Sequence, residues 1–389
     1  MNVAYILSAT TRYGGGTKSF LTLLDGAMSH GITPTLVVPD REGIYEDFKA
    51  RGFDVIVLNY RYSIYPYLQT LKDYLFFLPR LLMRKLLNWR ASRQLASLLA
   101  SRHIDLVHTN VSVIDIGFRA ARSLGIPHLY HLREYADKDF GMHYFPSKAA
   151  FYRSIDKPWS YTVCITKDIQ RHHRQMGCPH SRVIYDAVLL SPPPLTFTPT
   201  KSFFLFAGRI DASKGLDILL QAYAEADVTI PLYVAGEVRD TAYFQSQQRF
   251  VTEHQLHDRV KFLGQVEDLP ALMRQALAII IPSRFEGFGR CMPEAMCYGC
   301  LAIGYNTGGT KEQLDNGYQL EHEEIGLRFE TIGELSDQLR KVASSSPNAF
   351  RHYVERAYHT VCQLYSLEAH SAAIFQYYRE IVDTEKLRN

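Results

Sequence analysis

Two carboxylates flank a glycine-rich turn in residues 286–294, which read Glu-Gly-Phe-Gly-Arg-Cys-Met-Pro-Glu. An apolar run at 278–281 precedes the turn and Pro293 favours a first helical turn, so we expect a strand, a loop and a helix in that order. Glu286 then lies in the loop and Glu294 just inside the helix. Glycines let backbone N–H groups approach a ligand, and a helix N-terminus favours an anion. The segment predicts a phosphate site between two carboxylates, which suits a phosphorylated sugar. An ordinary loop with two solvated glutamates is the alternative.

Two cations follow another strand in the same half of the chain. The apolar run 203–207 predicts a buried strand, and Arg209 and Lys214 come after it, before a helical run that starts at Leu216. An arginine offers a bidentate fork and a lysine a point charge, so the pair suits a diphosphate. Taken alone, the turn also fits two solvated surface cations.

Three consecutive glycines, Gly14 to Gly16, follow the first predicted strand and precede a helical run at 17–28. They match the dinucleotide fingerprint only loosely. A nicotinamide site also needs an acidic residue at the end of the second strand to hold a ribose. Asp40 is the nearest candidate and Arg41 follows it directly, so we expect no nicotinamide dehydrogenase.

Short apolar runs alternate with helix-period segments in both halves of the chain. We expect strands at 3–7, 35–38, 55–58, 106–108, 128–131 and 161–165, and again at 203–207, 232–235, 260–263, 278–281 and 301–304. Strands separated by helices predict two α/β, Rossmann-like domains with parallel sheets. Ligands bind beyond the carboxyl ends of such strands, where all three glycine-bearing turns fall.

The 389 residues, 47% of them hydrophobic, exceed what one core usually supports. The proline-rich segment 189–201 predicts a linker between a domain at 1–188 and a second domain from 202. Up to residue 190 there are 24 Lys and Arg against 15 Asp and Glu (net +9), and beyond it 19 against 25 (net −6). The basic half suits an anionic membrane surface or a phosphate-bearing substrate, or is simply solvated.

Compartment and cofactor classes follow from what the sequence lacks. It has no run of 18 apolar residues, and Met1–Leu7 carries no basic leader or cleavage site, so we expect a cytoplasmic protein. Six cysteines are too sparse for a disulfide framework, and no cysteine and histidine grouping has zinc-ligand spacing. We therefore expect no metal site and no nucleic-acid partner.

Together these motifs resemble glycosyltransferase family 4 (glycosyl transferases group 1), a family of retaining GT-B glycosyltransferases, over nearly the whole chain. The motifs that carry the resemblance are at 14–16, 208–209, 214–215, 286–294 and 308–312, the last reading Gly-Gly-Thr-Lys-Glu. The resemblance implies the GT-B fold, in which two Rossmann-like domains face each other across a cleft. It also implies that the second domain spans 202–372 and that a final helix at 373–389 crosses back to the first domain.

The resemblance also assigns roles to individual residues. Arg209 and Lys214 would hold the diphosphate of a nucleoside-diphosphate sugar, and Glu294 the ribose hydroxyls. Glu286 would hold the hydroxyls of the transferred sugar, with the backbone of Phe288 and Gly289 alongside.

In the first domain, Gly15 and Gly16 would lie beside this donor. His131 would face the donor sugar, although a lone histidine at a strand end is equally compatible with a structural role. In the reading usual for the family, the acceptor hydroxyl attacks on the face that the diphosphate leaves, so Glu286 orients and stabilises more than it acts as a base. No further cofactor is implied, because Arg209 and Lys214 supply the charge that a metal would provide.

Some positions depart from the family pattern. Residues 185–188 read Tyr-Asp-Ala-Val where relatives commonly have Asn-Gly, which puts a donor contact from that turn in doubt. Arg290 stands where small aliphatic residues are usual, and either adds a phosphate contact or points into solvent.

Leucines recur at helical spacing between residues 65 and 99, and the same segment carries positive charge at Arg80, Arg84, Lys85, Arg90 and Arg93. Such a helix can lie on an anionic membrane and suits a lipid-linked acceptor, or it packs on the sheet with a solvated basic face. Pro79 should kink or break it in either case.

The leading hypothesis is a retaining glycosyltransferase acting on a glycan or lipid-linked acceptor in bacterial cell-surface synthesis, either free in the cytoplasm or at the inner face of the membrane. The alternatives are a GT-B sugar-nucleotide epimerase, a sucrose-phosphate type synthase, and a non-catalytic sugar-nucleotide-binding subunit.

Overall fold

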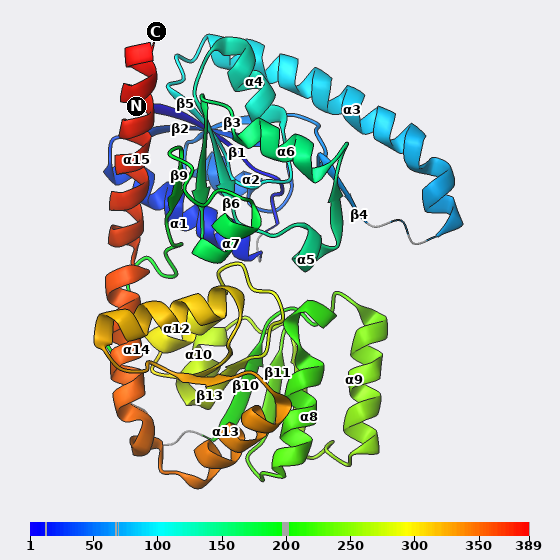
Figure 1. The fold of residues 1–389 in the computed structure, drawn as a ribbon, viewed down its shortest axis with the longest axis vertical. Coiled ribbons are helices and arrows are strands. Elements are labelled where there is room, and N and C mark those ends of the chain that lie inside the picture. The colour runs from blue at the N-terminus through cyan, green and yellow to red at the C-terminus, as the bar shows by residue number, and fades with distance from the viewer. Residues whose placement is uncertain (12–13, 67, 69, 197–201, 389) are drawn as a thin grey trace. The chain divides into compact units, whose positions relative to one another are not determined.

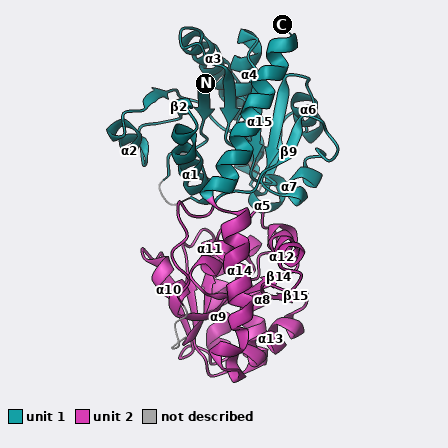
Figure 2. Cartoon of the chain, turned by 90° about the vertical axis from the view of Figure 1, so that its left-hand side faces the viewer, with its two compact units in different colours: residues 1–187, 367–389 teal, residues 188–366 magenta. Residues whose placement is uncertain are grey.

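The computed structural model describes residues 1–11, 14–66, 68, 70–196 and 202–388 (Figure 1). The chain forms two compact units, Met1–Ala187 with Leu367–Asn389, and Val188–Ser366 (Figure 2). The first segment of unit 1 ends at Ala187, one residue before the domain end predicted at residue 188. The chain returns to unit 1 at Leu367, whereas the sequence analysis expects this return at residue 373. Residues 189–196 of the predicted linker group with unit 2, and residues 197–201 lie outside the described part.

Unit 1 is built on a seven-stranded parallel sheet in the order β3-β2-β1-β5-β6-β8-β9. Its strands are β1 (Asn2–Ile6), β2 (Thr33–Val38), β3 (Asp54–Val57), β5 (Leu106–Thr109), β6 (His128–Leu132), β8 (Ser160–Cys164) and β9 (Ser181–Val183). Two further strands, β4 (Ile64–Pro66) and β7 (Met142–Tyr144), form a separate antiparallel pair. The helices are α1 (Gly15–Ser29), α2 (Tyr45–Ala50), α3 (Leu71–Ala100), α4 (Ile116–Leu124), α5 (Asp137–Phe140), α6 (Lys148–Ile155), α7 (Lys167–His172) and α15 (Leu367–Arg388).

Unit 2 contains a six-stranded parallel sheet in the order β12-β11-β10-β13-β14-β15. Its strands are β10 (Phe203–Ala207), β11 (Leu232–Ala235), β12 (Val260–Gly264), β13 (Ala276–Ile281), β14 (Leu301–Tyr305) and β15 (Leu327–Phe329). Its helices are α8 (Leu216–Ala226), α9 (Thr241–Glu253), α10 (Leu269–Gln275), α11 (Cys291–Cys297), α12 (Gly308–Glu321), α13 (Ile332–Ser344) and α14 (Arg351–Leu364), with 3-10 turns at η1 (Ala212–Lys214) and η2 (Pro347–Phe350). Every strand predicted from the sequence is present in the two sheets.

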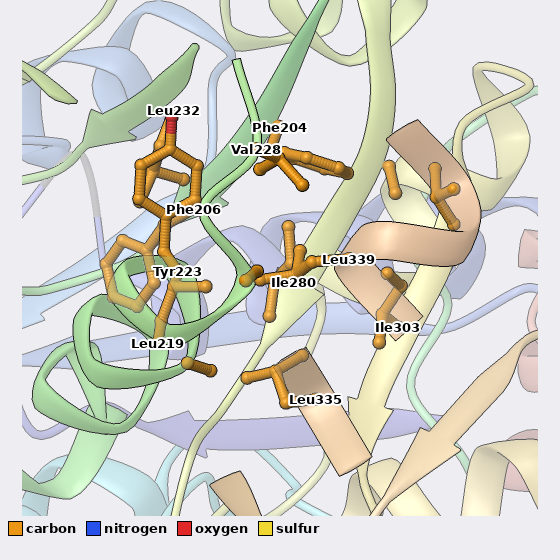
Figure 3. Packing of buried hydrophobic residues seen from close by; sticks show 14 of the residues in the cluster. Phe204, Phe206, Leu219, Tyr223, Val228, Leu232, Ile280, Ile303, Leu335 and Leu339 are labelled. Carbon is orange, nitrogen blue, oxygen red and sulfur yellow. The ribbon is translucent and has the colours of Figure 1, made fainter. Parts of the chain in front are cut away.

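The core of unit 2 shows why its strands are continuous apolar runs. Phe204 and Phe206 of β10 project from one face of the sheet, where Leu219 and Tyr223 of α8 pack with them (Figure 3). Leu339 of α13 belongs to the same buried cluster. Helices on both faces leave no side of the central strands for solvent, so β10 and β13 contain no polar residue, whereas Lys261 of β12 and Arg328 of β15 lie on the two edge strands.

The C-terminal helix α15 belongs to the core of unit 1. A Cβ at Gly26 of α1 would lie 2.1 Å from the hydroxyl oxygen of Ser371 and 3.2 Å from its Cβ, so a larger residue there would displace the side chain of Ser371 on α15. Ile374, Phe375 and Tyr378 are fully or almost fully buried there. Burying each such side chain contributes about 1.5–3 kcal/mol, which makes α15 a structural part of the first sheet's cover.

Helix α3 continues through Pro79, so the expected break is absent. Pro79 removes only the N–H that would reach the carbonyl of Leu75, and Leu75 is 66% exposed, so water can satisfy that carbonyl. The helix starts at a capping box in which Thr70 accepts from the Asp73 N–H at 3.2 Å and Asp73 accepts from the Thr70 N–H at 3.1 Å. In the described part of the chain, no helix combines the length and the apolar character that a membrane crossing requires.

Candidate functional site

Strands β10 and β13 form the switch point of the unit 2 sheet. They are neighbours in the sheet, but the chain continues from them toward opposite edges. Connections that leave in opposite directions open a crevice beyond the strand ends, where ligands of such sheets bind. The two turns singled out in the sequence leave from these two strands. Lys214 follows β10 and Glu286 follows β13, and their side chains meet with Nζ 2.7 Å from Oε2.

A glycine brings the two turns together. Gly215 has φ +69°, and a Cβ there would lie 2.1 Å from the carbonyl oxygen of Pro282, just after β13. Any larger residue would push the turn carrying Lys214 away from the turn carrying Glu286. The side chains of Lys214 and Glu286 are only 18% and 14% exposed, so their ion pair is better protected from water than a surface pair.

Two further glycines hold the Glu286 loop against α12. Gly289 has φ +81°, and a Cβ there would lie 2.6 Å from Cγ of Glu286. The N–H of Gly309 donates to the carbonyl oxygen of Glu286 at 2.7 Å, and a Cβ at Gly309 would lie 2.6 Å from the carbonyl oxygen of Gly287. The backbone of the loop and the first turn of α12 are therefore in direct contact.

Phe288 anchors this loop through its side chain. The ring is 3% exposed and meets the ring of Tyr365 edge-on, with the centroids 5.4 Å apart. Gln313 of α12 donates from Nε2 to the Phe288 carbonyl oxygen at 2.5 Å. The side chain of Phe288 is therefore taken up by packing, and the ligand contact of its backbone stays a prediction of the sequence analysis. Gln313 was missed there, although it lies one residue beyond the 308–312 motif.

A cavity of about 50 Å³ lies at the meeting point of the two turns. Lys214, Glu286, Gly289 and Arg290 line it, together with Gly208 at the end of β10. Sites for whole cofactors usually measure about 300–1,000 Å³, so this cavity suits one group of a ligand, such as a phosphate.

Arg209 and Glu294 lie outside the described lining of this cavity and have protein partners. Nε of Arg209 is 3.3 Å from Oδ2 of Asp211, in a pair that is one-third and one-fifth exposed. Oε1 of Glu294, in α11, lies 3.0 Å from Nη2 of Arg290, the residue directly before that helix. Arg290 also donates to the carbonyl oxygen of Val188 at 2.5 Å and its side chain is 12% exposed, so it does not point into solvent.

In unit 1, Gly15 and Gly16 open helix α1 directly after β1 at the switch point between β1 and β5. The N-cap residue Gly14 has no side chain to cap the helix. A Cβ at Gly16 would meet no described atom within 4 Å. Packing therefore does not require glycine at position 16, and the space beside the backbone is open to a ligand.

His131 lies near the end of β6, fully buried, in a chain of polar side chains. Its Nδ1 is 3.2 Å from Nε2 of His108 and 3.2 Å from Nη2 of Arg133. The hydroxyl of Tyr378, on α15, bonds to Nδ1 of His108. Burial first, and then the positive charge of Arg133, hold the pKa of both histidines well below the usual value, so both rings are neutral.

The proton on His131 can be placed from its neighbours. A guanidinium only donates, so Nδ1 of His131 accepts from Arg133 and the ring proton is on Nε2. His108 then donates from Nε2 to His131 and accepts from Tyr378 at Nδ1. Nε2 of His131 is buried and has no hydrogen-bond partner among the described residues. The network therefore leaves His131 neutral with its proton on Nε2, and the sugar contact of that N–H stays a prediction.

Arg133 is itself fixed by a buried ion pair that the sequence analysis did not find. Nη1 of Arg133 lies 2.5 Å and 2.6 Å from the two carboxylate oxygens of Asp186, and Nε donates to Asn110 at 3.1 Å. Asp186 stands in the turn where relatives commonly carry Asn-Gly. The departure from the family pattern therefore supplies the counter-ion for the arginine that orients His131. No group of three or more possible metal ligands occurs in the described residues.

Two family models match the chain, one on each half. Glycosyltransferase Family 4 matches residues 13–190, and Glycosyl transferases group 1 matches residues 191–359. The glycosyltransferase MJ1178 of Methanocaldococcus jannaschii is 24% identical over 226 residues, which cover 57% of this chain. The alignment spans 62% of that relative, less than two thirds of its length.

Solved structures resemble the chain over almost its whole length. Anabaena Alr3699/HepE in complex with UDP matches with a TM-score of 0.74 at 17% identity, covering 97% of this chain and 99% of that one. Sucrose-phosphate synthase from Thermosynechococcus elongatus matches with a TM-score of 0.71 at 18% identity, covering 99% and 100%. At these identities the likeness shows a shared fold.

Proposed function

Because this chain belongs to the family 4, group 1 glycosyltransferases with the GT-B fold, we propose that it moves a sugar from a nucleoside-diphosphate sugar to a hydroxyl of a glycan or lipid-linked acceptor, with retention of the anomeric configuration. The observation that carries the proposal is the ion pair of Lys214 and Glu286 over the small cavity at the switch point of unit 2. A cation for phosphate and a carboxylate for hydroxyls are the two groups that a nucleotide sugar needs side by side.

The residues divide the work by their chemistry. Leaving of the diphosphate builds negative charge on phosphate, which Lys214 and Arg209 stabilise. A lysine ammonium has three donors, so its bond to Glu286 leaves two for phosphate oxygens, while a carboxylate has about four acceptor positions, so Glu286 retains capacity for sugar hydroxyls. Glu294 binds the ribose hydroxyls and the backbone of Phe288 and Gly289 lies beside the phosphates.

On the side of unit 1, we assign the sugar contact to His131 and the close backbone approach to Gly15 and Gly16. A neutral His131 with its proton on Nε2 donates to a sugar hydroxyl without repelling the positive charge that develops on the sugar ring. The acceptor hydroxyl attacks on the face that the diphosphate leaves, and a phosphate oxygen takes its proton. Lys214 and Arg209 replace a metal in this scheme, so a chelator should leave the rate unchanged.

The donor can be identified by thermal shift with UDP-, GDP-, ADP- and dTDP-sugars. A ligand present at 100 times its Kd stabilises the folded state by about 2.7 kcal/mol. UDP-sugars come first, since the similar Anabaena protein was solved with UDP. We then expect Lys214→Ala and Glu286→Gln to lower transfer while Lys341→Ala, an exposed lysine of α13, does not. Unchanged transfer by Glu286→Gln would refute the assignment of the site.

Product analysis separates the remaining alternatives. A sugar-nucleotide epimerase converts the donor without needing an acceptor, and a sucrose-phosphate type synthase uses a water-soluble sugar phosphate. Our proposal requires a glycan or a lipid-linked acceptor to support turnover.

We also propose that unit 1 contacts an anionic membrane through α3, on the cytoplasmic side, in cell-surface polysaccharide or glycolipid synthesis. Five leucines of α3 are 47–76% exposed, and the basic Arg80 and Arg90 lie on the same helix. All six cysteines are present as thiols, which fits a reducing compartment. Co-sedimentation with anionic vesicles tests this contact, and Leu75→Asp with Leu82→Asp should abolish it.

A further inference from the structure

Unit 1 contains a cavity of about 450 Å³ between α3, α4, α6 and the antiparallel pair β4 and β7. This volume lies within the range of about 300–1,000 Å³ that small-molecule sites occupy. None of Gly15, Gly16 and His131 is among the described residues that line it. It is therefore separate from the residues assigned to the donor.

Aromatic side chains form a rigid floor in this cavity. The rings of Tyr144 and Phe151 stack with centroids 4.6 Å apart, and Phe118 stacks on Tyr130 at 6.0 Å. The hydroxyl of Tyr144 lies 3.1 Å from the hydroxyl of Ser112, which holds it in place. Aromatic rings have few rotamers to lose, so the floor is formed before a ligand arrives.

The rim of the cavity is positively charged. Arg93, Arg119 and Arg122 line it against the one carboxylate of Asp115, which accepts from Nε of Arg119 at 2.6 Å. Arg93 lies over the ring of Trp89, with Cζ 4.6 Å from the ring centroid. Within the described chain Arg122 has no carboxylate at ion-pair distance. Guanidinium groups bind phosphate through paired N–H donors, so this rim selects a phosphate or a similar anion.

An apolar stripe on α3 ends at the same cavity. The stripe comprises the exposed residues Leu71, Leu75, Leu78, Leu82 and Leu86. Trp89 and Arg93 continue the spacing of three and four residues on the same helical face, and both line the cavity. From Leu71 to Trp89 the stripe is about 27 Å long, at 1.5 Å per residue. An anion site joined to a long apolar strip matches an amphiphile rather than a dissolved sugar phosphate.

We propose that the cavity binds the phosphate group of an amphiphilic lipid whose apolar chain lies along the leucine stripe of α3. Resting on the proposed function, this site would hold the lipid-linked acceptor by its phosphate. The aromatic floor receives the group next to that phosphate, and the stripe keeps the chain in contact with the membrane.

The test is binding of the full chain to three kinds of vesicle: phosphatidylcholine alone, phosphatidylcholine with hexadecyl phosphate, and phosphatidylcholine with phosphatidylglycerol at the same surface charge. We expect the hexadecyl phosphate vesicles to bind most tightly. Arg119→Gln with Arg122→Gln should weaken that binding about tenfold, because hydrogen bonds between charged groups are lost. The control Arg153→Gln with Lys157→Gln removes two exposed charges of unit 1 that lie outside α3 and do not line the cavity.

If the two double variants lost vesicle binding equally, general charge attraction would explain the binding and the proposed phosphate site would be wrong. If glucose 6-phosphate inhibited vesicle binding as strongly as dissolved hexadecyl phosphate does, the ligand would not be a lipid. Ser123→Phe, at an exposed lining position of α4, should block the cavity without removing charge. Thermal shift by the nucleotide sugar is measured in the same variants. If the wild type shows no shift, the proposed function fails while the lipid result stands on its own.

Discussion

A single methyl group at position 289 should separate stability from catalysis. Gly289 has φ +81°, and a Cβ added there would lie 2.6 Å from Cγ of Glu286. Ordinary contact begins at 3.4 Å, so Glu286 would have to move by roughly 1 Å. Because Cγ is near the backbone, the movement requires a rotation about χ1, and that rotation carries the carboxylate away from Lys214.

The two consequences of Gly289→Ala have different sizes. Left-handed backbone costs an alanine about 1–2 kcal/mol, which a denaturant titration would report as a loss of unfolding free energy. Misplacing a group in the site by about 1 Å lowers the rate on the order of 100-fold. We therefore expect a folded variant with a modest loss of stability and a large loss of transfer, measured with the donor that gives the largest thermal shift.

Gly52→Ala is the matched control. Gly52 has φ +79°, and a Cβ there would meet no described atom within 4 Å, so the control carries the backbone cost alone. It should lose similar stability and keep full transfer. If Gly289→Ala kept as much transfer as Gly52→Ala, the placement of Glu286 against Lys214 would be irrelevant to the reaction and the reasoning would be wrong.

Three further variants address other parts of the two units. Tyr378→Phe should lower transfer about tenfold by removing the hydrogen bond that holds the ring of His108 against His131, whereas Tyr377→Phe, which loses a bond to the carbonyl of His180, should not. Equal rates in the two variants would show that the hydrogen-bond chain has no part in the mechanism. Burial raises the pKa of Glu134 from 4.5 to about 7, so the folded state holds this proton longer than the unfolded state and stability falls as pH rises between these values, by about 3 kcal/mol. Glu134→Gln should remove that slope in unfolding titrations between about pH 5 and pH 8, and an unchanged slope would assign it to other groups. Gly309→Ala places a Cβ 2.6 Å from a backbone carbonyl of the loop after β13, so we expect a loss of both stability and donor binding in thermal shift, and an unaltered donor shift would contradict the close packing.

The sheet strands were predictable because buried parallel strands leave a strong pattern. The runs at 203–207 and 232–235 match β10 and β11 residue for residue, since helices cover both faces and every position is apolar. The strands β4, β7, β9 and β15 were not found, because they have three residues each. A pair such as β4 and β7 depends on contacts between distant segments, which no local pattern encodes.

The candidate site was predictable where one turn carries it and unpredictable where several elements share it. Arg209, Lys214, Glu286 and Glu294 stand in short motifs with glycines, and glycine spacing is a local signal. The partners that fix them are not local. Nothing in the sequence pairs Lys214 with Glu286 across 72 positions, and the pairing follows only from the order of the strands in the sheet.

His131 shows most clearly how distant segments determine one proton. Its ring is set by Arg133, which directly follows the last residue of β6, but that arginine is held by Asp186, 53 positions away. The ring beside it, His108, is held by Tyr378, which is 270 positions away and reaches unit 1 only because α15 returns to it. The return of the last helix is thus more than a cover for the sheet. If a neutral His131 donor serves the reaction, Tyr378→Phe should lower transfer while the protein still binds its nucleotide sugar through unit 2, and measuring transfer and binding in this one variant tests that division.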